Sequence, residues 1–157
     1  MNNTATDIEG VKIKKLNKLC DDRGFLMEVL RKDDDLLGSF GQLTFTVAFP
    51  GVIKAFHYHK KQDDLWFCPF GNIQIALFDM RENSSTHGKL QVVFAGENNP
   101  VLVLIPKMVA HGYRVLGQKE AGLFYVTTKE YDRKNPDEFR LPFDDPQIGM
   151  DWTTQCR

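Results

Sequence analysis

The chain has 157 residues, 42% of them apolar and 26% charged, which is typical of one folded globular domain and excludes a disordered chain. With 20 Lys and Arg against 21 Asp and Glu, the net charge of −1 provides no sequence-independent attraction to nucleic acid. The longest uninterrupted apolar run is Val101–Ile105, far below the roughly 20 residues of a membrane span. We therefore expect neither a nucleic-acid nor a membrane partner.

The cysteines and the first residues of the chain bear on its compartment. Cys20, Cys68 and Cys156 are far apart and odd in number, which favours reduced thiols over a disulfide framework. The first ten residues carry neither the basic region nor the apolar core of a secretory signal. Both observations predict a cytoplasmic protein.

Taken in chain order, the sequence predicts almost only β-structure. The charged runs at Lys12–Lys15 and Asp33–Asp35 are expected to be solvated surface, and Asp33–Leu37 to form at most one helical turn. The tail Asp132–Arg157 holds three prolines and is expected to be extended or irregular. Six short segments rich in Val, Ile, Phe and Thr, separated by Gly and Pro turns, read as strands: Phe25–Leu30, Leu43–Phe49, Asn72–Phe78, Leu90–Phe94, Val101–Ile105 and Gly122–Thr127. This spacing predicts an all-β sandwich or barrel.

Three histidines are the first candidates for a functional site. His57 and His59 lie two apart on a predicted strand, so their side chains should point to the same face, which in a small barrel is the lumen. His111 follows a strongly apolar strand, and we expect it to close the same cavity from the opposite sheet. His87 lies in a hydrophilic loop and is expected to be at the surface.

The region around these histidines resembles the cupin superfamily. The resemblance rests on Gly51-x5-His57-x-His59-x4-Asp64-x6-Gly71 for the first cupin motif and on Pro106-x4-His111 for the core of the second. It implies an all-β double-stranded β-helix, a cupin-like jelly roll with an irregular C-terminal tail. We expect one such domain over residues 1–157, with an N-terminal arm at about 1–20, a jelly-roll core at about 21–131 and the tail at about 132–157.

Within that superfamily the chain is most similar to the dTDP-4-dehydrorhamnose 3,5-epimerase family. The similarity covers about residues 21–152, and its strength lies in the order of the motifs rather than in any one of them. These are Asp21-x-Arg23-Gly24-Phe25-x-x-Glu28, Gln42, Gly51-Val-Ile-Lys54-Ala-Phe-His57-Tyr58, Phe78-Asp79-Met-Arg81-x-Asn-Ser84-x-Thr86-x-Gly88-Lys89, Ile105-Pro-x-x-x-Ala110-His111-Gly112, Tyr125-x-x-Thr128-x-x-Tyr131 and Asp145-Pro146-x-Ile148-Gly149-x-Asp151-Trp152.

The resemblance implies an isomerase that acts on a nucleotide-linked 4-keto-6-deoxyhexose. The C4 carbonyl acidifies the hydrogens on C3 and C5, so inversion requires a base on one face of the ring and a proton donor on the other. By position in the motifs, His57 matches the base and Tyr125 the donor. No cofactor is implied.

The resemblance also implies a set of substrate-binding residues and a homodimer. Residues matching those that line the lumen or hold the nucleotide and diphosphate are Arg23, Glu28, Gln42, Lys54, His59, His111 and Tyr131. In the family, the positions of Arg23 and Glu28 reach the site of a neighbouring subunit.

Several positions depart from the family pattern. Lys54 stands where the family usually has Arg, which keeps the charge but not the bidentate geometry. His59 replaces Gln, and Asp64 replaces a lumen Lys. The family's base pairs with an Asp beyond the Asp-Trp signature, whereas this sequence ends five residues after Trp152. Asp63 and Asp64 are therefore the candidate partners of His57.

Two other functions compete with the epimerase. His57, His59, Asp64 and His111 form a three-histidine, one-carboxylate set suited to Fe, Mn, Ni or Zn, which favours a metal-dependent cupin enzyme. The short C-terminus instead favours a non-catalytic sugar-binding jelly roll. Metal analysis separates the first of these from the epimerase, and hydrogen exchange on a 4-keto sugar nucleotide separates the second.

Overall fold

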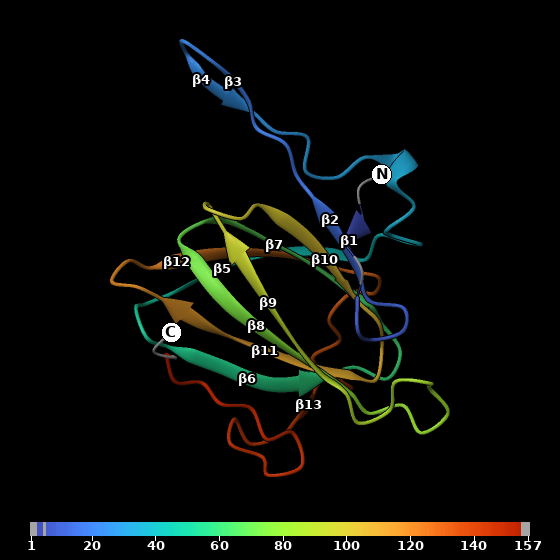
Figure 1. Ribbon diagram of the computed structural model, residues 1–157. Helices are drawn as coiled ribbons and strands as arrows, with labels where there is room; N and C mark the ends of the chain where they lie inside the picture. Colours follow the sequence, from blue (N-terminus) through green and yellow to red (C-terminus); the bar gives the residue numbers. More distant parts are fainter. Residues whose placement is uncertain (1–2, 5, 155–157) are drawn as a thin grey trace.

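The computed structural model describes residues 3–4 and 6–154, which form two facing antiparallel sheets (Figure 1). The larger sheet has, in spatial order, β1 (Asn3–Thr4), β2 (Lys12–Lys15), β10 (Val101–Ile105), β7 (Asp64–Phe70), β12 (Ala121–Thr127) and β5 (Gln42–Ala48). The smaller sheet has β13 (Phe139–Arg140), β6 (Ile53–Tyr58), β11 (Val109–Leu116), β8 (Asn72–Asp79) and β9 (Leu90–Gly96). The predicted all-β jelly roll is confirmed.

The predicted strands are present, but six further strands of the described residues were not predicted. Phe25–Leu30 contributes only its start to a strand, as β4 (Gly24–Leu26), which pairs with β3 (Leu19–Asp21). The strands that the sequence did not indicate are β1, β2, β3, β7, β11 and β13. In β7 and β11 most residues are buried on both faces, so the alternation that marks a half-buried strand is absent.

The main core lies between the two sheets and fills one end of the sandwich. Trp66 and Cys68 point inward from β7, and they meet Ile75 and Leu77 of β8 and Val103 of β10. All five side chains are almost fully buried.

The outer faces of both sheets are partly covered by segments outside the sandwich. Leu65 and Phe67 of β7 pack against Leu36, next to the short 3-10 helix η1 (Lys32–Asp34). On the other side the C-terminal tail packs Trp152 against Phe56 of β6, with ring centroids 5.5 Å apart. The tail is irregular apart from β13, as predicted.

The two charged runs are not simply solvated, which corrects the expectation from sequence. Lys12–Lys15 forms β2, which places Ile13 in the main core. Lys14 Nζ lies 2.5 Å from Asp34 Oδ2, and the two side chains are only 14% and 7% exposed. A charge run therefore supplies a strand and a nearly buried ion pair.

The β3–β4 hairpin projects away from the sandwich (Figure 1). Its apolar side chains are open to solvent, with Leu19, Phe25 and Leu26 each more than half exposed. β2 belongs to the larger sheet, whereas the hairpin lies outside both sheets. Among the described residues no helix is long and apolar enough to cross a membrane.

Candidate active site

A cavity of about 920 Å³ opens between the two sheets, and Trp66, Tyr113 and Leu123 of the main core form part of its lining. Strands from both sheets and residues 129–141 line it. It brings together many of the residues singled out from sequence: Gln42, Lys54, His57, His59, Asp64, Tyr125 and Tyr131.

His57 and His59 line the inner wall of this cavity, and His111 is buried beside them without lining it. His57 and His111 face each other in register on the neighbouring strands β6 and β11, with ring centroids 4.2 Å apart. His59 follows directly after β6, and its ring centroid lies 5.3 Å from that of His57. The expectation that His111 comes from the opposite sheet is wrong; the opposite sheet contributes Asp64, at the start of β7.

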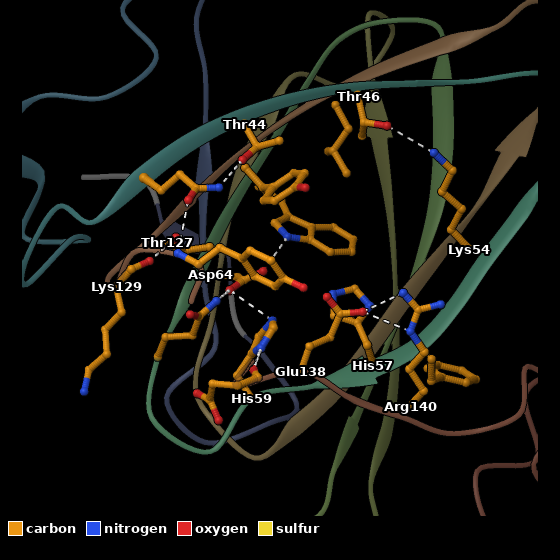
Figure 2. A pocket seen from close by; sticks show the side chains of 18 of the residues that line it. Thr44, Thr46, Lys54, His57, His59, Asp64, Thr127, Lys129, Glu138 and Arg140 are labelled. Carbon is orange, nitrogen blue, oxygen red and sulfur yellow. Dashed lines mark hydrogen bonds and ion pairs between the residues drawn. The ribbon is translucent and has the colours of Figure 1, made fainter. Parts of the chain in front are cut away.

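Asp64 is a buried carboxylate surrounded by nitrogen atoms. It is 2% exposed and accepts hydrogen bonds from Gln62 Nε2 and Trp66 Nε1, both at 3.2 Å. One of its oxygens lies 3.5 Å from His59 Nε2 (Figure 2), and the other lies 3.6 Å from His111 Nε2. Burial by itself would raise the pKa of Asp64, but the two imidazoles outweigh burial and hold that pKa well below its usual range.

The same surroundings act in opposite directions on His57 and His59. Burial, together with the neighbouring His111 and His59, lowers the pKa of His57 from 6.5 to about 2, so its ring is a neutral imidazole. Burial opposes protonation of His59 as well, but its contact with Asp64 raises the pKa of His59 above the ordinary value.

Backbone carbonyls fix the rings of His59 and His111. Nδ1 of His111 lies 2.8 Å from the carbonyl oxygen of Val109, and Nδ1 of His59 contacts the carbonyl oxygen of Asp137. The Asp137 carboxylate accepts hydrogen bonds from the backbone amides of residues 60 and 61, which holds the tail against the start of the loop after β6. In both rings Nε2 therefore points toward Asp64.

The outer part of the cavity carries the predicted substrate contacts. Tyr125 lies on β12 of the larger sheet, whereas His57 lies on β6 of the smaller one, so the two line the cavity from opposite sides. The side chain of Gln42 accepts a hydrogen bond from the backbone amide of Tyr131 at 3.1 Å, which places Tyr131 at the rim. Lys54 Nζ donates to Thr46 Oγ1 at 3.1 Å (Figure 2).

Some residues singled out from sequence lie outside this cavity. Arg23 is 84% exposed and pairs with Asp21 on the projecting hairpin, and Glu28 pairs with Arg31. Asp63, a candidate partner of His57, instead accepts a hydrogen bond from the backbone amide of residue 107 at 2.9 Å. His87 is exposed, as expected, and Cys156 lies outside the described residues.

Other cavity residues were not found from sequence. Arg140 lies on the two-residue strand β13, in register with His57, and pairs with Glu138 at 2.7 Å. Tyr113 of β11 lines the cavity with a buried hydroxyl group that has no hydrogen-bond partner in the described chain, and burial raises the pKa of Tyr113 to about 12. No local pattern marks them, because β13 is two residues long and Tyr113 reads as an ordinary strand residue.

Comparison with known proteins places this site in a family context. The model of the dTDP-4-dehydrorhamnose 3,5-epimerase family matches residues 5–157. The chain is 55% identical to the spore coat polysaccharide biosynthesis protein SpsL of Bacillus subtilis, covering 96% of this chain and 99% of that protein. It is 35% identical to a probable low-salt glycan biosynthesis epimerase of Haloferax volcanii, covering 95% and 97%.

A solved structure agrees with these sequence matches. The dTDP-6-deoxy-D-glucose-3,5-epimerase of Legionella pneumophila, determined in complex with dTDP-4-keto-L-rhamnose, superposes with a TM-score of 0.86 at 31% identity. The superposition covers 96% of this chain and 82% of that protein. Sequence and fold thus point to the same group of proteins.

Proposed function

The chain belongs to the dTDP-4-dehydrorhamnose 3,5-epimerase family of nucleotide-sugar isomerases, and we propose that its substrate is a dTDP-linked or similar 4-keto-6-deoxyhexose. The observation that carries the proposal is the placement of His57 and Tyr125 on opposite sheets, facing one cavity. A sugar ring bound between them presents one face to each residue. The relatives' names further suggest that the product is a precursor of a surface polysaccharide.

In the proposed reaction His57 removes a proton from the carbon next to the C4 carbonyl. Its neutral ring has a lone pair available, since burial keeps it unprotonated. A pKa near 2 makes a weak base, so the proton transfer relies on the negative charge of the developing enolate and of the diphosphate to favour the imidazolium form. Tyr125 then returns a proton from the other face, which inverts the centre. Only protons move, so the reaction needs no cofactor.

The remaining polar residues of the cavity bind the nucleotide and sugar in this proposal. Lys54 contacts only hydroxyl and carbonyl oxygens in the described chain, so its charge is available for the diphosphate. Gln42 positions Tyr131 as a stacking surface for the base. His59 lines the inner wall, where the sugar enters, and the buried His111 lies beside it.

We also propose a homodimer in the cytoplasm. Leu43, Phe45 and Val47 form an exposed apolar row on β5, the edge strand of the larger sheet. Such a row is typical of a protein interface, and pairing would protect the open edge. The projecting β3–β4 hairpin would carry Arg23 and Glu28 toward the partner's cavity. The free thiol of Cys20, which is exposed, suits a reducing compartment.

Hydrogen exchange with solvent tests the reaction. In deuterated water, wild-type protein should introduce deuterium at C3 or C5 of a dTDP-4-keto-6-deoxyhexose. His57→Gln should lower this exchange by about 10²–10⁴-fold, the usual contribution of a positioned base. Tyr125→Phe should retain exchange and lose inversion, since it removes only the donor.

Matched controls show whether the effects are specific. His87→Gln makes the same change at an exposed histidine, and Tyr58→Phe removes a hydroxyl from a β6 tyrosine outside the cavity. Both should keep wild-type rates. Full epimerisation by His57→Gln or Tyr125→Phe would refute the assigned roles, and no exchange by wild type on any 4-keto sugar nucleotide would refute the substrate class.

A complementation experiment tests the homodimer and the role of Arg23. His57→Gln and Arg23→Ala chains are each expected to be inactive alone. If Arg23 serves the partner's cavity, a mixed dimer has one site with both residues intact, so random mixing should restore about a quarter of wild-type activity. A monomer in light scattering, or no recovery on mixing, would contradict this arrangement.

A further inference from the structure

We propose that the inner wall of the cavity is a metal-binding site, in which His59, Asp64 and His111, with His57 as fourth ligand, hold one divalent transition-metal ion of the zinc type. The site itself is argued from geometry and hydrogen bonding and does not depend on the epimerase reaction.

The distances suit a four-coordinate ion. One ligand atom from each of the four residues lies within 4.8 Å of the other three. His59 Nε2 and His111 Nε2 lie 3.5 and 3.6 Å from the two oxygens of Asp64. Zinc–nitrogen bonds of about 2.0–2.1 Å in a tetrahedron put neighbouring ligand atoms about 3.4 Å apart. The two histidine–carboxylate pairs are already near this separation, and the remaining pairs, which lie within 4.8 Å, must contract by up to about 1.4 Å to close around an ion.

The hydrogen bonds of the two inner histidines select the tautomer that binds metal. Nδ1 of His111 and Nδ1 of His59 each face a backbone carbonyl oxygen, which can only accept, so each Nδ1 carries the proton. In the neutral ring Nε2 then has a free lone pair, which becomes available to a metal ion when the ion displaces any proton shared with Asp64. An Nδ1–H group bound to a backbone carbonyl is the usual second-shell contact of a metal-binding histidine.

The orientation of these lone pairs is the strongest indication of a missing cation. His111 Nε2 is fully buried and has no hydrogen-bond partner among the described residues, although it points at a carboxylate oxygen. His59 Nε2 faces the other oxygen of Asp64 in the same way. A nitrogen and a carboxylate oxygen that face each other in a buried site need a cation between them, which is either a proton on Nε2 or a metal ion that displaces that proton.

The donor set and its surroundings indicate the class of ion. Three imidazoles and one carboxylate suit Zn²⁺, Fe²⁺, Co²⁺ or Ni²⁺, whereas Mg²⁺ and Ca²⁺ prefer a shell of oxygens. Gln62 and Trp66 hold the Asp64 carboxylate in place by hydrogen bonds. Supporting contacts of this kind orient a metal-binding carboxylate.

Metal binding at this site would affect catalysis. This consequence rests on the proposed function, whereas the metal site itself does not. The lone pair with which His57 would accept a substrate proton is the one that a metal ion would take. The metal-bound protein should therefore be inactive as an epimerase, and removal of the ion should restore activity.

Cobalt provides a direct test, because four-coordinate Co²⁺ with nitrogen ligands has intense visible absorption. Protein dialysed against a chelator should bind one Co²⁺ per chain, with this spectrum, and Zn²⁺ should displace it. His59→Gln and Asp64→Asn should each weaken binding by at least about 100-fold, more than the loss of a supporting contact costs. His87→Gln should bind as wild type does. Thermal unfolding without metal shows whether each variant is folded.

The outcomes separate the two proposals. Less than stoichiometric binding by wild type, six-coordinate cobalt spectra, or unchanged binding by folded His59→Gln protein would overturn the metal site. Cobalt binding without epimerase activity in either form would leave the site in place and refute the proposed reaction. Exchange activity that rises with bound metal would refute His57 as the fourth ligand.

Discussion

Gly112→Ala should separate the two strands that carry the central histidines. Gly112 lies on β11 between His111 and Tyr113, where the register against β6 shifts. A β-carbon added there would lie 2.3 Å from Cβ and 2.6 Å from Cα of Ala55, and 2.8 Å from the carbonyl oxygen of Lys54. The obstacle is mostly strand backbone, so no side-chain rotation relieves it.

The size of the effect follows from these distances. Ordinary van der Waals contact begins near 3.4 Å, so β6 and β11 must move apart by about 1 Å at this point. Overpacking of this kind typically lowers the free energy of unfolding by about 1–3 kcal/mol. A displacement of about 1 Å in a catalytic group costs about 10²-fold in rate. Because His57 moves with β6, the variant should lose both stability and hydrogen exchange.

Urea unfolding and solvent deuterium exchange measure the two effects separately. Gly38→Ala is the matched control, since a β-carbon there meets nothing within 4 Å and Gly38 does not have a positive φ. The control should keep wild-type activity, with stability unchanged or raised by up to about 1 kcal/mol. A Gly112→Ala protein with wild-type stability and exchange would show that the two strands do not approach as closely as described.

Three further variants test other parts of the molecule. Asp79→Asn should lower the free energy of unfolding by about 1.5–3 kcal/mol at pH 7, because this fully buried carboxylate accepts charged hydrogen bonds from Arg81. These contacts outweigh burial and keep the pKa of Asp79 below 3.8. The stability contributed by the charged carboxylate is therefore present above pH 3.8 and is lost on acidification. The difference in the free energy of unfolding between wild type and variant, measured in urea, should be smaller at pH 3 than at pH 7. Trp152→Ala should cost about 3–5 kcal/mol in the same assay, through lost packing on Phe56. Lys54→Gln should weaken dTDP binding by about 10–100-fold in calorimetry, and Lys54→Arg should retain it.

The fold was largely predictable because most strands have one buried face. In β5 the buried and exposed residues alternate, so Leu43–Phe49 could be recognised from sequence. β7 could not, because its two faces contact different apolar groups: Trp66 the main core, and Leu65 the segment before β5. The burial of Lys14 could not be predicted from sequence either, because its partner Asp34 lies 20 residues away, in the 3-10 helix η1.

The candidate site was predictable as a list of residues but not as an arrangement. The spacing of His57 and His59 indicated a common face, and both line the cavity. The position of His111 depends on the strand order of the smaller sheet, in which β11 lies beside β6. The 53 residues between His57 and His111 contain no local pattern that indicates this neighbourhood, which is why the opposite sheet was the wrong choice. Arg140 enters the cavity through the same kind of long-range pairing, between β13 and β6.

The two departures from the family pattern at the inner wall form a single feature of the structure. In sequence, His59 for Gln and Asp64 for Lys are separate changes five residues apart. In the structure His59 follows β6 of the smaller sheet and Asp64 begins β7 of the larger one, and the two side chains lie 3.5 Å from each other. A carboxylate that is 2% exposed requires partners, and His59 supplies one of the nitrogen atoms around it. Neither residue can therefore be understood alone, and the effects of His59→Gln and Asp64→Asn on stability and on metal binding should be strongly non-additive in a double-mutant cycle.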